Sequence, residues 1–155
     1  MGAIITRFMC QDHDRLNHML KECRIFSAKD PAAASEVVSA LKKEVERHIA
    51  WEEHILFPVF EQRLRAKEHG PTAAMRKEHC RIKEIVEHMH ACAVAGKDFE
   101  THLLELVDTL NAHTAKEEEA LYPWIDNRMG EDGAMKLIAS MKAMPEAEYA
   151  SPGAK

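Results

Sequence analysis

The sequence predicts an all-α protein, an antiparallel up-down-up-down four-helix bundle with a short C-terminal fifth helix. Apolar residues recur at steps of three and four along four long segments, which is the period of an amphipathic helix. Most of the six glycines and six prolines stand where that pattern breaks. No alternating run of strand type occurs in the sequence. Long helices with short connections favour an antiparallel bundle.

The first two helices are separated by Asp30-Pro31, and the second is expected to end before Gly70-Pro71. The first helix is expected from about Ile4 to Ala28. The second begins after Asp30-Pro31, with Ser35 as its suggested capping residue, and runs to about His69. The Gly70-Pro71 pair that follows ends it.

The third and fourth helices close at glycines. The third is expected over residues 72–95 before Gly96, and the fourth over residues 98–129 before Gly130. A fifth helix, over residues 133–144, is expected to pack across the end of the bundle. Residues 1–144 therefore form one domain, and the small, polar residues 145–155 a flexible C-terminal tail.

Composition narrows the class of protein. The formal net charge is −5 and basic residues are mixed with acidic ones, so we expect no nucleic-acid partner. No run of 18 apolar residues occurs, which predicts no membrane span. The first residues lack the pattern of a cleaved signal, so a cytoplasmic location is expected. The four cysteines have no C-x-x-C spacing and are expected to be free thiols.

A repeat is the most informative feature of the chain. His48-x3-Glu52, with a Leu-aromatic-Pro sequence after it, recurs as His113-x3-Glu117 followed by the same Leu-aromatic-Pro pattern. Upstream of each copy stands an isolated histidine on an apolar stripe, His13 in the first half and His79 in the second. Pro58 lies in the expected second helix and Pro123 in the fourth. Because proline lacks an amide donor, each is expected to bend its helix or to end the regular part of it.

This spacing predicts a metal site. Residues four apart share a helix face, so each His-x3-Glu pair presents an imidazole and a carboxylate together. Helical bundles build di-iron and di-manganese sites from such pairs. A buried carboxylate without a partner is costly, and coordination would satisfy it. The candidate ligands are His13, His48, Glu52, His79, His113 and Glu117.

Simpler explanations exist for single residues but fit the whole set poorly. A lone histidine on an apolar stripe is more often a core residue than a ligand, and a lone His-Glu pair is usually a surface contact. A duplication that kept only packing would explain the Leu-aromatic-Pro repeat but not the shared histidine and glutamate. Glu53 and Glu118 suit acceptors for imidazole N–H groups, with solvent exposure as an equal alternative.

These motifs resemble the hemerythrin-like HHE domain family, in its four-histidine form, over about residues 8 to 129. The resemblance implies a non-haem centre of two Fe ions, bridged by an oxo or hydroxo group and by Glu52 and Glu117. The four histidines would then be terminal ligands. Family members bind dioxygen reversibly, sense iron or oxygen, or take part in iron and nitric oxide chemistry.

The sequence departs from the oxygen carriers of that family. They carry a His-x3-His pair on the third helix, whereas His79 here has Met75 four residues before it and Lys83 four after it. The fourth helix of the carriers uses His-x4-Asp, whereas the matching options after His113 here are Glu117 at +4 or Glu118 at +5. The candidates to replace the missing histidine are His18, Glu53 and Glu118.

Three functions follow from the site. The preferred one is a di-iron protein that binds or senses dioxygen or another small diatomic or peroxide ligand. The alternatives are a di-iron enzyme with peroxidase-like, catalase-like or nitric oxide-linked activity, and an iron-handling or repair protein. The cluster-repair members of the family carry an additional cysteine-bearing N-terminal domain, which is not expected before a first helix that begins near Ile4.

Overall fold

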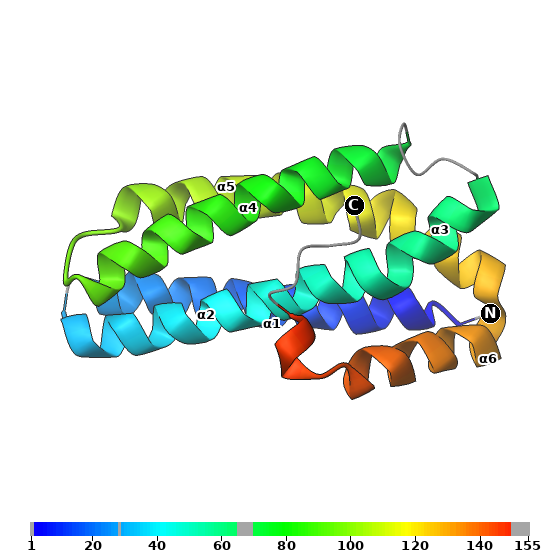
Figure 1. Cartoon of the computed structure of the whole chain (residues 1–155), viewed down its shortest axis with the longest axis horizontal. Coiled ribbons are helices and arrows are strands. Elements are labelled where there is room, and N and C mark those ends of the chain that lie inside the picture. The colour runs from blue at the N-terminus through cyan, green and yellow to red at the C-terminus, as the bar shows by residue number, and fades with distance from the viewer. Residues whose placement is uncertain (1, 28, 65–69, 150–155) are drawn as a thin grey trace.

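The computed structural model describes residues 2–27, 29–64 and 70–149. Within these ranges the chain is helical and contains no strand. Long helical rods lie side by side, as Figure 1 shows. The rods are α1 (Ile4–Ser27), α2 (Pro31–Trp51) continued by η1 (Glu52–Leu56) and α3 (Phe57–Leu64), α4 (Pro71–Val94), and α5 (Glu100–Lys116) continued by η2 (Glu117–Leu121) and the first half of α6 (Tyr122–Ala143). The predicted all-α helical bundle is confirmed.

The start of α2 differs from the prediction. Asp30, and not Ser35, caps this helix, because the Asp30 carboxylate accepts hydrogen bonds from the backbone N–H groups of Ala32 and Ala33. Pro31 then occupies the first turn, where the missing amide donor costs nothing. The expected end of this helix near His69 falls outside the described residues.

The two prolines of the repeat follow turns of π-helix. The regular part of α2 ends at Trp51 and that of α5 at Lys116, as the prolines predicted. In each turn the hydrogen bond spans five residues. The N–H of Phe57 donates to the carbonyl of Glu52, and the N–H of Tyr122 donates to the carbonyl of Glu117. Each turn therefore holds one extra residue, which shifts the helix face that follows it.

The expected fifth helix is the second half of α6. Gly130 interrupts α6 with φ 67° and ψ −179°, a conformation in the region that favours glycine. Figure 1 shows the chain turning back beyond this point and running along α1, where the sequence had suggested a helix across the bundle end. After α6, η3 (Glu146–Glu148) adds a short 3-10 turn. The flexibility expected for residues 145–155 stays a prediction.

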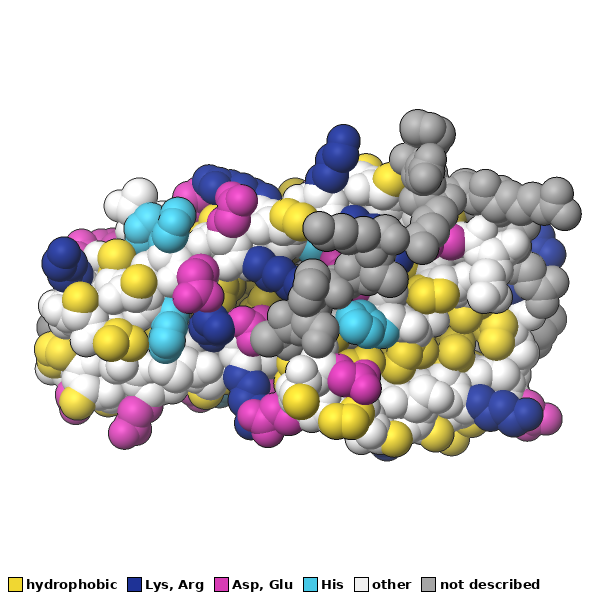
Figure 2. Space-filling view, viewed as in Figure 1, with side chains coloured by type: hydrophobic (Ala, Val, Ile, Leu, Met, Phe, Trp, Pro, Cys, Tyr) yellow, Lys and Arg dark blue, Asp and Glu magenta, His cyan; other side chains and the backbone are white. Residues whose placement is uncertain are grey.

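The core has two apolar parts. One contains residues such as Leu20, Leu41 and Met89, and the other residues such as Ile5 and Phe57. Polar side chains interrupt the apolar stripes between them, and this polar layer contains the predicted ligands. On the face drawn in Figure 2, acidic and basic side chains are interspersed over the helices. Among the described helices, none has both the length and the apolar character needed to cross a membrane.

Candidate metal centre

The polar layer of the core gathers the six predicted ligands from four rods of the bundle. The side chains are almost fully buried, and the two glutamates are completely so. They form two overlapping groups of four, in which one ligand atom from each residue lies within 4.8 Å of all the others. We call these the first half-site (His13, His48, Glu52 and Glu117) and the second half-site (His79, His113, Glu52 and Glu117).

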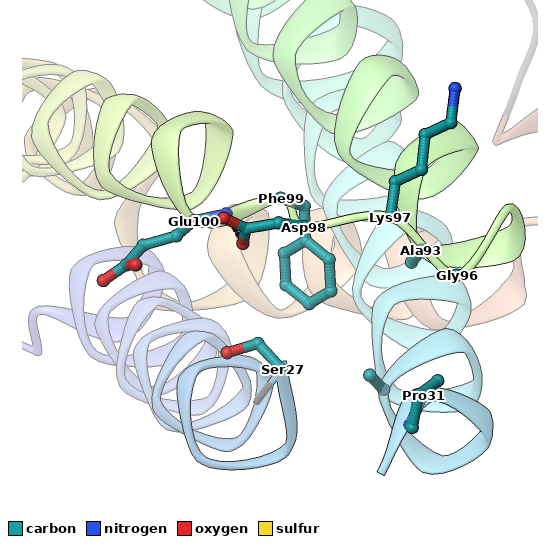
Figure 3. A pocket seen from close by; sticks show the side chains of 9 residues that line it. Ser27, Pro31, Ala93, Gly96, Lys97, Asp98, Phe99 and Glu100 are labelled. Atoms are coloured by element: carbon teal, nitrogen blue, oxygen red, sulfur yellow. Dashed lines mark hydrogen bonds between the residues drawn. The ribbon is translucent and has the colours of Figure 1, made fainter. Parts of the chain in front are cut away.

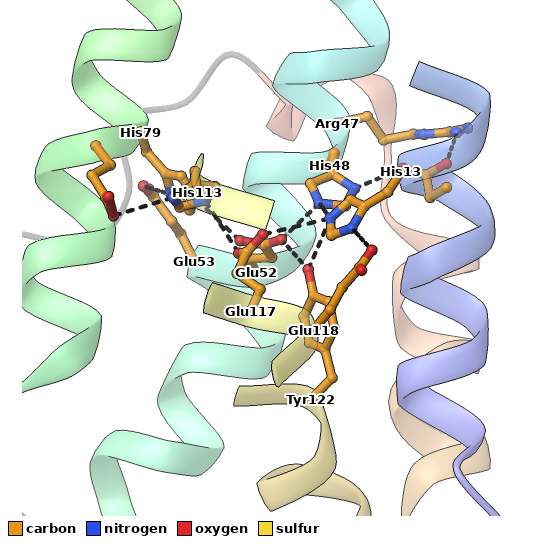
Figure 4. Close-up of polar contacts among 12 residues, drawn as sticks. His13, Arg47, His48, Glu52, Glu53, His79, His113, Glu117, Glu118 and Tyr122 are labelled. Atoms are coloured by element: carbon orange, nitrogen blue, oxygen red, sulfur yellow. Dashed lines mark hydrogen bonds and ion pairs between the residues drawn. The ribbon is translucent and has the colours of Figure 1, made fainter. Parts of the chain in front are cut away.

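Both glutamates belong to both half-sites and lie between the two pairs of histidines, as Figure 4 shows. For Glu52, Oε1 is 2.7 Å from Nε2 of His48, and Oε2 is 3.0 Å from Nε2 of His79. For Glu117, Oε1 is 3.5 Å from Nε2 of His13, and Oε2 is 3.2 Å from Nε2 of His113. Each carboxylate thus offers one oxygen to each half-site, which is the arrangement a carboxylate bridge between two ions requires.

Each histidine is oriented by a carboxylate of its own, which contacts the ring nitrogen that faces away from the centre. In each case the Nδ1 atom contacts an acidic side chain, so that Nε2 is the atom facing the centre. The pairs are His13 with Glu118 at 2.7 Å, His48 with Asp12 at 2.7 Å, His79 with Glu53 at 2.9 Å and His113 with Glu78 at 3.2 Å. Of the two alternatives for Glu53 and Glu118, the structure shows the acceptor role for both, and the side chain of Glu118 is in addition 41% exposed.

The inward-facing histidine nitrogens need a positive charge between them. The Nε2 atoms of His13 and His48 are 3.1 Å apart, and those of His79 and His113 are 3.0 Å apart. When Nδ1 carries the proton, each Nε2 presents a lone pair, and two lone pairs at this distance repel unless a proton or a metal ion lies between them. The geometry of each pair is consequently that of a cation-binding pair.

Unsatisfied oxygens in the same layer also fit a metal. Among the described residues, Oε2 of Glu52 and both carboxylate oxygens of Glu117 are buried without a hydrogen-bond partner. Burying carboxylate oxygens in this way is costly unless a cation compensates them. The donor set of imidazole nitrogen and carboxylate oxygen, with no thiolate, suits a first-row metal such as iron.

The raised pKa values of two of the histidines reflect the excess of carboxylates around them. Burial lowers the pKa of His48, but the carboxylates of Glu52 and Asp12 outweigh burial and raise this pKa to about 10. Burial also opposes protonation of His79, yet its contacts with Glu52 and Glu53 raise its pKa to about 9. In the metal-free chain, protons bound to these histidines therefore supply the positive charge that metal ions would otherwise provide.

Tyr122 is a member of the centre that the sequence reasoning missed. Its side chain is fully buried, and its hydroxyl donates a hydrogen bond of 2.7 Å to Oε1 of Glu52. The same hydroxyl lies 3.2 Å from Nε2 of His13. The π-turn of η2 brings Tyr122 in phase with Glu117, five residues earlier. The available signal was the second copy of the Leu-aromatic-Pro motif, where tyrosine replaces phenylalanine.

Asp12 and Glu78 were also missed as partners of the histidines. Each directly precedes an isolated histidine of the repeat, which was the signal in the sequence. By contrast, His18 lies apart from the centre, with its side chain 75% exposed and 3.3 Å from Glu22. None of His18, Glu53 and Glu118 belongs to either group of four.

A cavity of about 300 Å³ lies elsewhere in the bundle, between the end of α1 and the loop that joins α4 to α5. Figure 3 shows Ser27, Lys97 and Phe99 among the side chains that line it. None of the six predicted ligands lines this cavity, so it is separate from the centre.

Comparison with curated proteins gives distant relatives. The chain is 26% identical over 144 residues to the iron-sulfur cluster repair protein YtfE of Enterobacter sp., covering 79% of this chain and 65% of that protein. It is 28% identical over 144 residues to YtfE of Salmonella paratyphi B, with the same coverage. It is 24% identical over 133 residues to a DNA nickase of Nostoc sp., covering 85% of this chain and 36% of that protein.

The chain thus spans less than two thirds of the length of these curated relatives. No solved structure matches the chain. The sequence profile of the hemerythrin HHE cation-binding domain matches residues 4–143, which include all six predicted ligands. The chain therefore belongs to the hemerythrin HHE cation-binding domain family.

Proposed function

We propose that the protein binds two iron ions, one in each half-site. The histidines would be terminal ligands, and Glu52 and Glu117 would bridge the ions together with a solvent oxygen. The observation that carries the proposal is the position of the two glutamates, each of which turns one oxygen to each half-site. Three of these four oxygens have no hydrogen-bond partner among the described residues.

We further propose that the iron-loaded centre binds or senses a small ligand. Each half-site offers two imidazole nitrogens and two carboxylate oxygens, so an ion of higher coordination number keeps positions for solvent and for a ligand. Iron in such a shell supplies affinity for dioxygen, nitric oxide or peroxide. The ring of Phe57 covers His79, and Glu52 and Glu117 are completely buried, so bulk water is excluded from the centre.

Metal stoichiometry tests the first proposal. Protein produced without added metal is expected to contain two irons per chain, while Glu52→Ala and His113→Ala should each contain less than one. His18→Ala is the matched control, because His18 is exposed and apart from the centre. Two irons retained in both centre variants would show that the ligands are wrong. A wild-type chain with no bound metal would contradict the proposal itself.

Spectra test the small-ligand proposal. Reduced, iron-loaded protein is prepared anaerobically, and its absorption spectrum should change when dioxygen or nitric oxide is then added. For one of the two gases, the change should reverse when the gas is removed. Steady consumption of peroxide would instead indicate an enzyme. A spectrum that responds to none of these ligands would contradict ligand binding.

An iron-handling role in iron-sulfur cluster repair is the second candidate. The relatives named YtfE favour it, and iron-sulfur proteins would then be the partners. The test is to damage an iron-sulfur enzyme with nitric oxide, add the iron-loaded chain and measure recovered enzyme activity. Recovery with wild type but not with Glu52→Ala supports the role, and equal recovery with both contradicts it.

A further inference from the structure

We infer that Tyr122 makes the two half-sites unequal, so that the second half-site takes up metal first and the first half-site holds a weaker, exchangeable ion. The inference rests on the proposed binding of two metal ions. Tyr122 acts here as a positioning residue, because it works through Glu52.

The first step is the asymmetry between two equivalent positions. Phe57 and Tyr122 occupy the same place in the two copies of the repeat, and both are completely buried. Each also follows a π-turn that begins at a bridging glutamate. The two half-sites therefore share a backbone plan and differ in the aromatic side chain that closes each of them.

The second half-site is closed by an apolar ring. The ring of Phe57 stacks on that of His79, with centroids 5.4 Å apart and planes 6° apart. Phe57 has no polar atom, so it gives Oε2 of Glu52 no hydrogen bond, and the 3.0 Å contact of Oε2 is with Nε2 of His79, which is itself a donor of this half-site. Oε2 keeps its full capacity to coordinate a cation.

The first half-site is closed by a hydroxyl. The Tyr122 hydroxyl donates to Oε1 of Glu52 at 2.7 Å and lies 3.2 Å from Nε2 of His13, so it touches two of the four donors of this half-site. Its ring is tilted by 40° against that of His13, with centroids 5.7 Å apart. The hydroxyl thus lies among the donor atoms, as Figure 4 shows.

A hydrogen bond and a metal ion compete for the same oxygen electrons. A donor hydroxyl withdraws negative charge from Oε1 of Glu52, and buried hydrogen bonds to charged groups are the strong ones. Coordination at the first half-site therefore gains less than coordination at the second, where Oε2 has no such partner. Two ions that share the same bridging carboxylates should consequently bind in two steps of different affinity.

Cobalt(II) titration of the metal-free full chain tests the inference, because cobalt absorption reports each ion as it binds. Wild type should show two steps of different affinity. Tyr122→Phe removes the hydroxyl and keeps the ring, and the weaker step should tighten by about tenfold, the lower end expected for a hydrogen bond to a charged group. The control is Tyr149→Phe, since Tyr149 is the only other tyrosine of the chain and should leave both steps unchanged.

Histidine variants assign the steps to the half-sites. His13→Ala should keep the tight step and lose the weak one, while His79→Ala should lose the tight step. The opposite assignment would overturn the inferred order. So would two equal steps in wild type, or a Tyr122→Phe titration identical to that of wild type.

A third readout separates hydrogen bonding from direct ligation. If Tyr122 were a phenolate ligand, the ferric protein would carry a visible charge-transfer band that disappears in Tyr122→Phe, and this result would overturn the donor role. A wild-type chain that binds fewer than two cobalt ions would instead contradict the two-metal proposal and the inference with it. Circular dichroism verifies that each variant is folded.

Discussion

Asp12 shows how a single residue outside the six ligands can govern the centre. Its carboxylate contacts Nδ1 of His48 at 2.7 Å and is held in turn by Arg15 at 2.7 Å. Burial raises the pKa of Asp12, but His48 and Arg15 outweigh burial and lower this pKa to about 2. The residue is therefore a charged acceptor at every physiological pH, and it keeps Nε2 of His48 turned to the first half-site.

Loss of this acceptor should weaken metal binding. Asp12→Ala leaves His48 free to rotate or to change tautomer, and losses of such partners typically cost about 10- to 100-fold in metal affinity. Competition with a chelator of known affinity measures the change. Arg15→Ala is the matched control, because it removes an ion pair of Asp12 but keeps the contact between Asp12 and His48. Equal losses in both variants would argue against orientation of His48 as the cause.

At the residue scale, the candidate ligands could be predicted from the sequence, but the carboxylates that contact the histidines could not. A repeated histidine or glutamate is visible by eye, since the same residue recurs at the same place in both halves. Asp12 and Glu78 occupy matching positions too, but their roles depend on which ring nitrogen they meet, and that is set by the packing of separate helices.

At the scale of elements, helix ends were the least accurate part of the prediction. Ser35 has the right chemistry for a cap, but Asp30 stands immediately before Pro31, whose fixed φ suits the first turn of a helix. Two signals therefore competed within five residues. The local hydrogen bonds to Ala32 and Ala33 decide between them in favour of the earlier one.

Two substitutions distinguish the caps. Asp30→Ala should lower the free energy of unfolding by about 1 kcal/mol, the usual effect of removing a side-chain cap. Ser35→Ala should leave it within about 0.5 kcal/mol, because Ser35 lies inside α2 and alanine is the better helix former. Urea unfolding of both variants gives the comparison, and a larger loss in Ser35→Ala would reverse the assignment.

The π-turns were not predicted, although the prolines after them were recognised as disturbances of the helix. The 3.6-residue repeat of apolar side chains does not reveal a π-turn, because apolar residues lie on both sides of the one inserted residue. In η2 that insertion decides whether Leu121 or Tyr122 follows Glu117 on the face of the centre. Both side chains are buried, and the hydroxyl of Tyr122 reaches Glu52 because of this turn.

At the scale of the whole molecule, the centre places negative charge in the middle of the core. In the metal-free chain the raised pKa values of His48 and His79 mean that folding binds protons there. Stability from a raised pKa is fully present below the unfolded value near pH 6.5 and is lost as the pH rises through about 9 to 10. Metal ions bound in the half-sites would supply the positive charge without protons.

The two states should therefore respond differently to pH. In the presence of a chelator, the free energy of unfolding should fall steadily from pH 6.5 to pH 9, while the iron-loaded protein should be more stable and change less over the same interval. Urea unfolding at several pH values measures both. A metal-free stability that rises over this interval would contradict the assigned charges.

Local signals were enough to predict the class of fold, the four long helical segments and the six candidate ligands, because helical period, turn residues and repeats are properties of neighbours along the chain. The tertiary structure decided the rest. It set which oxygen of each glutamate faces which half-site, which carboxylate stands behind each histidine, and that Tyr122 closes one half-site while Phe57 closes the other. These features depend on contacts between separate helices, which in the pair of His13 and Glu118 are 105 residues apart in the sequence, and no local pattern records such contacts.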